Sequence, residues 1–405
     1  MLVALVHTDF RLYWPSRIMA LFNYLNKTGD HLRVIEIAGR GSPYSFSGAA
    51  EHDAYWSCLF PQKQMEDIPS SAAAESIYQV LDEIHPDVVI SGPIAYPSGA
   101  AAVRWARRRK KPVVIMDNAR LQDVPRSPIV NWVKRRIYAN VDALLIPALS
   151  HVRDYKFWGL AEEQMFFGVN VVDNDFFAVR AALARNNDEA VRAKYGLPKR
   201  FFLGIGRQIP KKNWLALIHA FASVNSTVAA EWGLVLVGDG PEAKRLQSAA
   251  EKTDGRVVFL PFQNQENLSE IYGVAVCFIL PSLYGETWGN VINEAMACRL
   301  PVMVSEQCGC AETLVRDGYN GWQFDPHNND QLAALINKFI SLSEEERKQM
   351  GENSFQIIRQ WALDRFCEGI WQAVQFCMKK PARGYAAPVI DRIILNLWKG
   401  RYRPV

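Results

Sequence analysis

Short apolar runs rich in β-branched residues alternate with helical patterns along most of the chain, and this alternation restricts the possible folds. In the first half the runs are "LVALVHT" (2–8), "LRVIEIAG" (32–39), "DVVISGP" (87–93), "KPVVIMDN" (111–118) and "DALLIPA" (142–148). The runs are largely apolar on both faces, as expected of parallel strands covered by helices on either side. The pattern therefore predicts a doubly wound α/β architecture.

The alternation is interrupted between residues 170 and 200 and then begins again. The interrupting segment is polar and rich in turn-forming residues, and we interpret it as a connector. The second series of runs is "FFLGIGR" (201–207), "GLVLVGDG" (233–240), "RVVFLPF" (256–262), "AVCFILPS" (275–282) and "LPVMVSE" (300–306). We predict a Rossmann-like domain over 1–185, a second one over 186–378, and a tail over 379–405 that packs back on the first domain.

The charge distribution bears on the kind of partner. The chain has 405 residues with 22% charged residues and a formal net charge of only +4, so it carries no global signal for nucleic-acid binding. Basic residues are concentrated in "RWARRRKK" (104–111) and "WVKRRIY" (132–138). These segments indicate either solvated helix faces or contact with an anionic surface such as a membrane leaflet.

Cysteine usage and the apolar runs bear on the compartment. Seven scattered cysteines show no disulfide spacing, which predicts reduced thiols and a cytoplasmic protein. The lone C-x-C of Cys308 and Cys310 has no second ligand pair nearby, so we expect no zinc site. The apolar N-terminus "MLVALVH" has no basic segment before it and predicts a first strand, not a signal peptide. No apolar run is long enough to cross a bilayer, so any membrane contact is expected to be peripheral, at the inner face.

The turn after the strand-like run at 201–205 could bind phosphate. In "GIGRQIPKKN" (204–213), Gly206 would allow a close approach to the backbone, and Arg207 and Lys212 follow it. A planar guanidinium and a compact ammonium suit a diphosphate. The alternative is a glycine turn with two surface cations.

The next junction resembles a dinucleotide fingerprint only in outline. In "VLVGDGPEAKRL" (235–246), Gly238, Gly240 and Ala243 give G-x-G-x-x-A between a strand and a helix. That fingerprint also requires an acidic residue at the end of the next strand, where this chain has "QNQ". A close-packed strand–helix turn is therefore favoured over a nicotinamide site.

Two carboxylates flank the next strand–helix junction, "PSLYGETWGNVINE" (281–294). Thr287 is expected to cap a helix that starts near Trp288, and the free amides of a helix start attract phosphate. Glu286 precedes this helix start, and Glu294 lies about 80° round and ~12 Å along an ideal helix. Carboxylates that far apart are expected to hold different hydroxyl pairs of an extended ligand, with phosphate between them.

This stretch resembles the E-x7-E motif of retaining glycosyltransferases of family 4, which have the GT-B fold of two Rossmann-like domains facing across a cleft. The segments "GIGRQIPKKN", "LVGDGP", "EAMACRLPVMVS" and "CGCAETLVRDGYNGWQF" extend the resemblance in the family's order. It implies that Arg207 and Lys212 bind the donor diphosphate. It also implies that Glu286 contacts donor-sugar hydroxyls and that Glu294 holds the ribose. The implied donor site further includes Gly206, Gly238, Thr287, Trp288, Gly289, Asn290 and Val291, and "CGCAE" (308–312) resembles a loop that closes on the donor.

The first domain departs from the family pattern. Its N-terminal loop, "HTDFRLYWPS" (7–16), has no glycine, and Arg11 is considered as an anion contact there. Many relatives carry a histidine near the sugar after the strand that matches "PVVIMDN", where this chain has Asp117; an ionised aspartate can only accept hydrogen bonds. Asp117 is retained as a candidate catalytic residue. His7 is a candidate cleft residue, and His151 could be either structural or a ligand contact.

The resemblance implies transfer of a sugar from a nucleoside-diphosphate sugar to an acceptor hydroxyl, with the anomeric configuration retained. Uracil is the family's commonest base, with guanine open, and the acceptor would be a cell-surface glycan or a lipid-linked glycan. The resemblance implies no required cofactor and no metal. It also implies no dedicated protein base, since the leaving phosphate takes the acceptor proton. The alternatives are a nucleotide-sugar epimerase, a phosphorylase, a dehydrogenase, or a non-catalytic sugar-binding protein.

Overall fold

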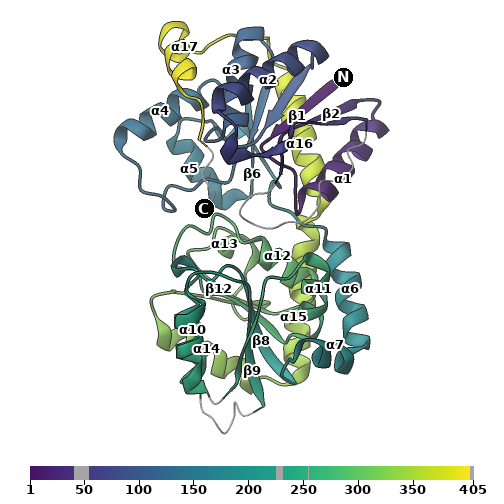
Figure 1. The fold of residues 1–405 in the computed structure, drawn as a ribbon, viewed down its shortest axis with the longest axis vertical. Helices are drawn as coiled ribbons and strands as arrows, with labels where there is room; N and C mark the ends of the chain where they lie inside the picture. Colours follow the sequence, from purple (N-terminus) through teal and green to yellow (C-terminus); the bar gives the residue numbers. More distant parts are fainter. Residues whose placement is uncertain (41–53, 225–230, 254, 402–405) are drawn as a thin grey trace. The chain divides into compact units, whose positions relative to one another are not determined.

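The chain forms two compact units. The computed structural model describes residues 1–40, 54–224, 231–253 and 255–401. The first unit comprises Met1–Leu121, Pro125–Val171 and Leu363–Val405, and the second comprises Gln122–Val124 and Val172–Ala362. Figure 1 shows a layered α/β structure in each unit.

The first unit contains a seven-stranded parallel sheet in the order β3-β2-β1-β4-β5-β6-β7. Its strands are β1 (Leu2–His7), β2 (His31–Arg40), β3 (Trp56–Gln64), β4 (Val88–Ser91), β5 (Val113–Met116), β6 (Ala143–Ile146) and β7 (Met165–Phe167). The five strands predicted from the first series of apolar runs are confirmed. The runs missed the edge strands β3 and β7, because β3 is polar in its second half and β7 has only three residues.

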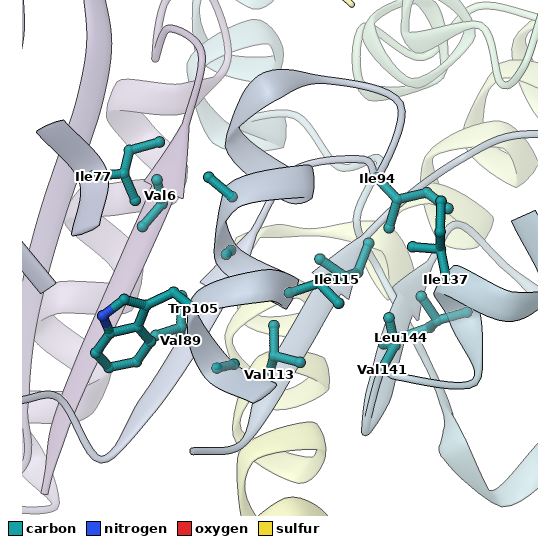
Figure 2. Packing of buried hydrophobic residues seen from close by; sticks show 14 of the residues in the cluster. Val6, Ile77, Val89, Ile94, Trp105, Val113, Ile115, Ile137, Val141 and Leu144 are labelled. Atoms are coloured by element: carbon teal, nitrogen blue, oxygen red, sulfur yellow. The ribbon is translucent and has the colours of Figure 1, made fainter. Parts of the chain in front are cut away.

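Helices cover this sheet. They are α1 (Trp14–Lys27), α2 (Ser70–Ile84), α3 (Pro97–Arg109), α4 (Pro128–Tyr138), α5 (Val152–Phe157), α16 (Leu363–Met378) and α17 (Pro388–Leu397), with short 3-10 turns at 65–67, 149–151 and 162–164. Strands β4, β5 and β6 are buried along their whole length. Figure 2 shows their side chains meeting helix residues such as Trp105 and Ile137 in one apolar core. Burial on both faces explains why these strands read as continuous apolar runs.

Helix α16 lies in the first unit, which differs from the predicted domain boundary at 378. It contacts α1, β6 and β7. A Cβ atom on Gly369 would lie 2.2 Å from the carbonyl oxygen of Phe167, so only glycine allows this approach of α16 to β7. The predicted boundary at 185 also differs, since the second unit begins at Val172.

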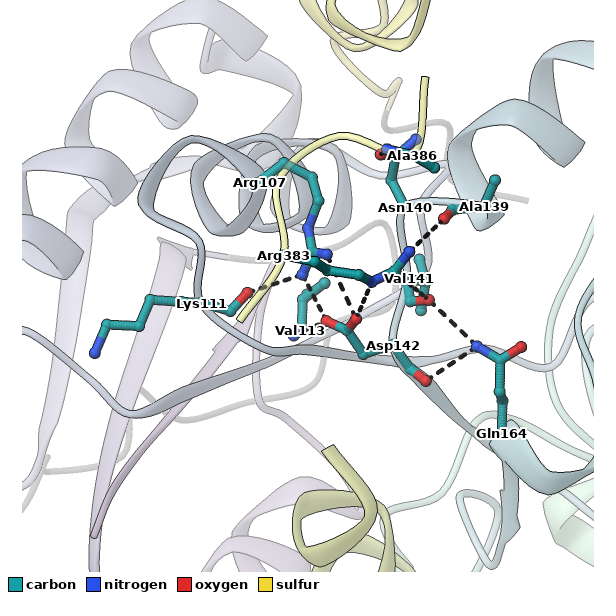
Figure 3. A network of polar contacts seen from close by, with 10 residues as sticks. All are labelled: Arg107, Lys111, Val113, Ala139, Asn140, Val141, Asp142, Gln164, Arg383 and Ala386. Carbon is teal, nitrogen blue, oxygen red and sulfur yellow. Dashed lines mark hydrogen bonds and ion pairs between the residues drawn. The ribbon is translucent and has the colours of Figure 1, made fainter. Parts of the chain in front are cut away.

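The segment after α16 is attached to the first unit by a buried carboxylate. Asp142 accepts hydrogen bonds from Arg107 Nη2 at 2.5 Å and from Arg383 Nε at 2.6 Å, as Figure 3 shows. Arg383 also donates to the carbonyl oxygens of Ala139 and Val141. One carboxylate therefore joins a core arginine to the C-terminal segment.

Removal of this carboxylate is expected to destabilise the first unit. Asp142→Ala leaves the fully buried side chain of Arg107 without its counter-ion, which should cost about 3–5 kcal/mol. The control Glu162→Ala removes an exposed ion pair with Lys156 and should cost less than about 1 kcal/mol. Urea unfolding followed by circular dichroism measures both, and equal midpoints for the two variants would contradict the expected role of Asp142.

The second unit contains a six-stranded parallel sheet in the order β10-β9-β8-β11-β12-β13. Its strands are β8 (Arg200–Ile205), β9 (Trp232–Val237), β10 (Val257–Leu260), β11 (Cys277–Leu280), β12 (Val302–Ser305) and β13 (Gly321–Phe324). Its helices are α6 (Asn174–Asn186), α7 (Asp188–Tyr195), α8 (Trp214–Ala222), α10 (Ala243–Ala250), α11 (Gln265–Val274), α12 (Asn290–Ala297), α13 (Ala311–Leu314), α14 (Asn329–Ser341) and α15 (Glu344–Ile358). The 3-10 turns are at 210–212, 251–253 and 359–361. All five predicted strands are confirmed, and β13 was missed.

The interpretation of residues 170–200 as a connector was wrong, because most of the segment forms α6 and α7. The Asp173 side chain caps α6 by accepting from the Phe176 amide at 3.0 Å. Phe177, Ala181 and Ala184 are buried on one face of α6, which packs against α11. Two of these three core residues are alanines, so the apolar face is narrow and the polar residues around it dominated the pattern.

Both sheets have the reversal of strand order that places ligand sites in open α/β folds. In the second unit the chain passes from β8 through β9 to β10 on one side and from β11 through β12 to β13 on the other. The loops that follow β8 and β11 therefore emerge side by side. In the first unit the reversal lies between β1 and β4.

Candidate functional site

The loops after β8 and β11 meet through an ion pair. Lys212, in the 3-10 turn after β8, pairs through Nζ with the Glu286 carboxylate on the loop after β11. Ser282 Oγ donates to the same carboxylate at 3.2 Å. The two charged side chains are mostly buried, with 12% and 16% of their surfaces exposed. The structure thus brings together two of the residues predicted from the sequence, at the strand-order reversal of the second unit.

The electrostatics of this pair favour charged forms within a cluster of cations. Burial alone would raise the pKa of Glu286, but the adjacent Lys212 ammonium holds that pKa below its ordinary value. Burial lowers the pKa of Lys211, and the positive charges of Lys212 and Arg207 lower it further, while Glu286 opposes the shift. Three cations of one loop, Arg207, Lys211 and Lys212, therefore lie near the Glu286 carboxylate, and a second carboxylate, Asp123, also acts on Lys211.

Gly238 allows the loops after β8 and β9 to pack closely. A Cβ atom on Gly238 would lie 2.3 Å from the carbonyl oxygen of Gly206, too close for any other residue. The Gln208 amide donates to the Asp239 carbonyl oxygen at 2.8 Å, and the Gln208 side chain donates to the Gly238 carbonyl oxygen at 2.6 Å. The geometry agrees with the close-packed turn favoured from the sequence and fixes the backbone from which Arg207 and Lys212 extend.

Helix α12 starts later than predicted, so the expected capping by Thr287 was wrong. The helix begins at Asn290, and its N-cap is Gly289, whose φ of 108° lies in the left-handed region. Trp288 lies before the helix, and its buried indole Nε1 donates to Asn293 Oδ1 at 2.9 Å. The first turn of the helix consequently starts at Asn290, next to the loop that carries Glu286.

Glu294 lies inside the unit. Its side chain is almost fully buried, and Tyr272 on α11 donates its hydroxyl to Glu294 Oε2 at 2.8 Å. Residues 286–289 are not helical, so the ideal-helix separation from Glu286 does not apply. The two carboxylates have different neighbours, since Glu286 faces the Lys212 ammonium and Glu294 faces the Tyr272 hydroxyl.

The loop after β12 is tied to the loop after β11 through the backbone. The Gly309 amide donates to the Glu286 carbonyl oxygen at 2.9 Å, and the Cys310 amide donates to the Trp288 carbonyl oxygen at 3.1 Å. The "CGCAE" segment therefore lies beside the candidate donor loop. Both cysteines are buried free thiols.

Asp117 lies in the first unit and is held by internal hydrogen bonds. Its carboxylate accepts from Tyr138 hydroxyl at 2.5 Å and from the Ala119 amide at 3.0 Å. Burial, and then the charge of Asp117, raises the pKa of Tyr138 well above its ordinary value, so the tyrosine stays a donor. These contacts give Asp117 an evident part in shaping the loop after β5.

The N-terminal loop of the first unit places other candidates near the strand-order reversal. His7 is enclosed and accepts from the Thr8 amide at 2.8 Å through Nδ1; burial and the charge of Arg17 lower its pKa to about 4. Burial raises the pKa of Glu36 to about 7, while Arg11 opposes the rise. His151 is buried beside Ser150, 3.1 Å from its hydroxyl.

Sequence reasoning missed three residues of this site: Lys211, Ser282 and Tyr272. Lys211 and Ser282 lie within the quoted motifs, beside residues that were chosen, and their position directly after strands could have indicated them. Tyr272 lies on α11, and nothing in its local pattern connects it with Glu294.

Two features are absent from the described residues. Among them, no three His, Cys, Asp or Glu side chains are grouped as a metal ion would require. Within the same part of the chain, no helix has the length and apolar character needed to cross a membrane.

Residues 187–357, most of the second unit, match the sequence model of the family described as "Glycosyl transferases group 1". The two Rossmann-like units and this match over 187–357 agree with the class predicted from the sequence, a glycosyltransferase of the GT-B type.

Individual proteins agree with this class. The sulfoquinovosyl transferase SQD2 of Arabidopsis thaliana is 26% identical over 81% of this chain and 63% of its own length. A glycosyltransferase from Rickettsia africae has a similar structure, with a TM-score of 0.73 and 16% identity over 94% of this chain and 99% of its own. Alr3699/HepE of Anabaena, solved in complex with UDP, has a TM-score of 0.68 and 16% identity over 93% and 100% of the two chains. The chain spans between 46% and 63% of the length of the first curated relatives that it matches.

Proposed function

We propose that the protein transfers a sugar from a nucleoside-diphosphate sugar to an acceptor hydroxyl with retention of the anomeric configuration, as in glycosyltransferases of family 4. The observation that carries the proposal is the ion pair of Lys212 and Glu286 within the cation cluster of Arg207, Lys211 and Lys212. Three cations gathered at a strand-order reversal suit an anionic ligand. A carboxylate in the same place suits the hydroxyls of a sugar attached to that anion.

The proposed diphosphate site uses the cations and the start of α12. The Lys212 ammonium has three N–H donors, so its bond to Glu286 leaves two that can reach phosphate oxygens. Arg207 adds a planar guanidinium, and the first amides of α12 add the positive end of a helix dipole. Gly206 and Gly238 supply the close-packed turn behind these groups.

The flanking parts of the donor are assigned to the two glutamates. Glu286 is charged, since its pKa is lowered, and it would accept hydrogen bonds from donor-sugar hydroxyls. Glu294, fixed by Tyr272, is proposed to hold the ribose hydroxyls. The UDP complex of the Anabaena neighbour supports a uridine donor, with guanosine as the alternative.

The proposed reaction breaks the bond between the anomeric carbon and the phosphate oxygen. The acceptor oxygen forms its bond on the same face of the sugar, and its proton passes to the leaving diphosphate, so no separate protein base is required. The cations stabilise charge that grows on the diphosphate as this bond breaks, and that gain lowers the barrier instead of only tightening binding. The proposal requires no cofactor and no metal.

The acceptor is proposed to bind the first unit, because the second unit takes the donor. We expect a hydroxyl of a glycan or of a lipid-linked glycan. Asp117 would act there by holding the loop after β5, with His7 and Arg11 on the N-terminal loop as further candidates.

A thermal-shift screen with UDP-, GDP- and ADP-sugars tests the donor site. A donor at 100 times its Kd adds about 2.7 kcal/mol, which should raise Tm by about 5–10 °C for a domain of this size. We expect UDP-sugars to give the largest shift. The donor assignment is wrong if no nucleotide-sugar changes Tm.

Product analysis separates the alternatives. With p-nitrophenyl glycosides and polyprenyl-diphosphate-linked sugars as acceptors, a transferase releases the nucleoside diphosphate only when a suitable acceptor is present. An epimerase would interconvert two nucleotide-sugars without an acceptor. A binding protein would show the thermal shift and no turnover.

A further inference from the structure

Two helices of the first unit, α4 and α17, contact each other and expose large apolar side chains. Every one of the following is at least 43% exposed: Ile129, Val130 and Trp132 on α4, and Val389, Ile390, Ile393 and Leu397 on α17. Exposed apolar residues are ordinary when scattered, but seven on two contacting helices form a patch. We call these seven residues the α4–α17 patch.

The outward side chains of α17 are not the ones that attach the helix. Its inner side is held by Asp391, which pairs with Arg136, and by the buried Leu395. Trp398, just beyond the helix, donates its indole Nε1 to the Ile94 carbonyl oxygen at 2.7 Å. Docking of α17 on the first unit thus leaves Val389, Ile393 and Leu397, spaced by four residues, along its outer face.

The basic segments noticed in the sequence contribute less free charge than expected, because many of their cations are used internally. Lys134 is buried with its ammonium 3.5 Å from the centre of the Trp158 ring, and burial lowers its pKa to about 8. Arg104 is also buried and donates to the Trp398 carbonyl oxygen at 2.9 Å. Arg107 and Arg136 pair with the carboxylates of Asp142 and Asp391 described above.

The exposed charged residues on α4 and α17, and those just after α17, are positive. They are Arg135 on α4, Arg392 on α17, and Lys399 and Arg401 just after it. In the described residues 125–139 and 386–401 the acidic residue is Asp391, which is buried and paired. The patch is therefore apolar with a basic margin, which complements an anionic layer above an apolar one.

We propose that the α4–α17 patch docks on the surface of a lipid bilayer that contains anionic lipids. The aliphatic side chains of α17 enter the region between headgroups and acyl chains, where apolar area is removed from water. Trp132 lies at the depth that indole rings prefer, and the exposed cations contact the headgroups. Because four cations of the basic segments are used internally, we expect apolar burial to contribute more than charge.

This inference stands on exposure and charge and does not rest on the proposed reaction. It can therefore be tested without a known donor or acceptor, and its failure leaves the proposed function untouched. The competing occupant of the patch is a second copy of this chain.

Flotation of the full chain with vesicles tests the proposal. We expect binding to vesicles of phosphatidylcholine with about 30% phosphatidylglycerol, and weaker binding to phosphatidylcholine alone. The double variant Ile393→Gln/Leu397→Gln should bind at least about tenfold more weakly, because two inserted side chains become polar. Its Tm should stay unchanged, since both side chains face solvent.

The matched control is Val179→Gln/Leu183→Gln. These residues have the same spacing on α6 of the second unit and are 60% and 58% exposed. The control should bind vesicles like the unchanged protein. A second variant, Arg135→Glu/Arg392→Glu, should remove the preference for anionic lipid while leaving part of the binding.

Two results would overturn the proposal. One is absence of vesicle binding by the full chain. The other is equal binding by the α17 variant and the α6 control. If sedimentation shows a dimer that the α17 variant abolishes, and vesicles bind neither form, the patch is an interface between two copies.

Discussion

Replacement of Glu286 by glutamine is expected to lower the turnover of sugar transfer by at least about 10²-fold while nucleoside diphosphate still binds. The carboxylate is charged and fixed by Lys212 and Ser282 at the strand-order reversal of the second unit. In our proposal it contacts the sugar, and the diphosphate is held by cations. Loss of the Glu286 charge should therefore lower the turnover of sugar transfer more than the affinity for the nucleoside diphosphate.

Calorimetry with UDP and a transfer assay measure the two effects separately. The affinity for UDP should change by less than about threefold, well under the 1.4 kcal/mol of a tenfold change. Glu345→Gln, on the exposed side of α15, is the matched control and should leave both quantities unchanged. Undiminished turnover in Glu286→Gln would exclude Glu286 from the donor site. Glu286→Ala should behave similarly, and its Tm shows whether the buried Lys212 tolerates loss of its partner.

Replacement of Lys212 by alanine should, unlike Glu286→Gln, also cause a large loss of affinity for the nucleoside diphosphate. A charge-assisted hydrogen bond contributes about 1.5–3 kcal/mol, so the Kd for UDP should rise by about 10–100-fold. Turnover should fall by about 10²–10³-fold, because the ammonium stabilises charge that develops on the leaving diphosphate. Arg207→Ala should weaken UDP binding in the same direction.

The ion pair makes the two variants interdependent. Lys212→Ala also removes the charge that keeps the pKa of Glu286 low, so part of its effect acts through the carboxylate. A double-mutant cycle with Glu286→Gln separates these contributions, and the double variant should lose far less than the product of the single losses. Lys348→Ala, exposed on α15, serves as the control. Unchanged UDP affinity in Lys212→Ala and Arg207→Ala would show that these cations do not bind the diphosphate.

The local sequence was sufficient for the central strands and insufficient for the edges and for α6. Strands such as β5 and β11 are buried on both faces. Each of their residues is therefore apolar, and the apolar run could be recognised in the sequence. The edge strand β3 is largely polar, and α6 buries a narrow face made mainly of alanines. In both elements only the residues that pack against a neighbouring element are apolar, so the hydrophobic pattern is too weak to predict the whole element.

The donor motifs could also be found from the sequence, since Arg207, Lys212, Glu286 and Glu294 lie in short segments whose order resembles a known family. The local structure around these residues could not be predicted from the sequence. The start of α12 was expected near Trp288 with Thr287 as cap, yet the left-handed backbone at Gly289 delays the helix to Asn290. That conformation depends on how the loop packs against the segment after β12, which is distant in sequence.

The sequence by itself determined the two α/β units, their central strands and the residue types that could bind a diphosphate and sugar hydroxyls. Those features depend on local composition and on periodicity along the chain. Only the tertiary structure decided that Lys212 meets Glu286, that Tyr272 fixes Glu294, and that several cations of the basic stretches make internal contacts while apolar side chains of α4 and α17 stay exposed. These outcomes depend on contacts between residues from about 20 to more than 250 positions apart, and a side chain's charge and exposure are set by such neighbours.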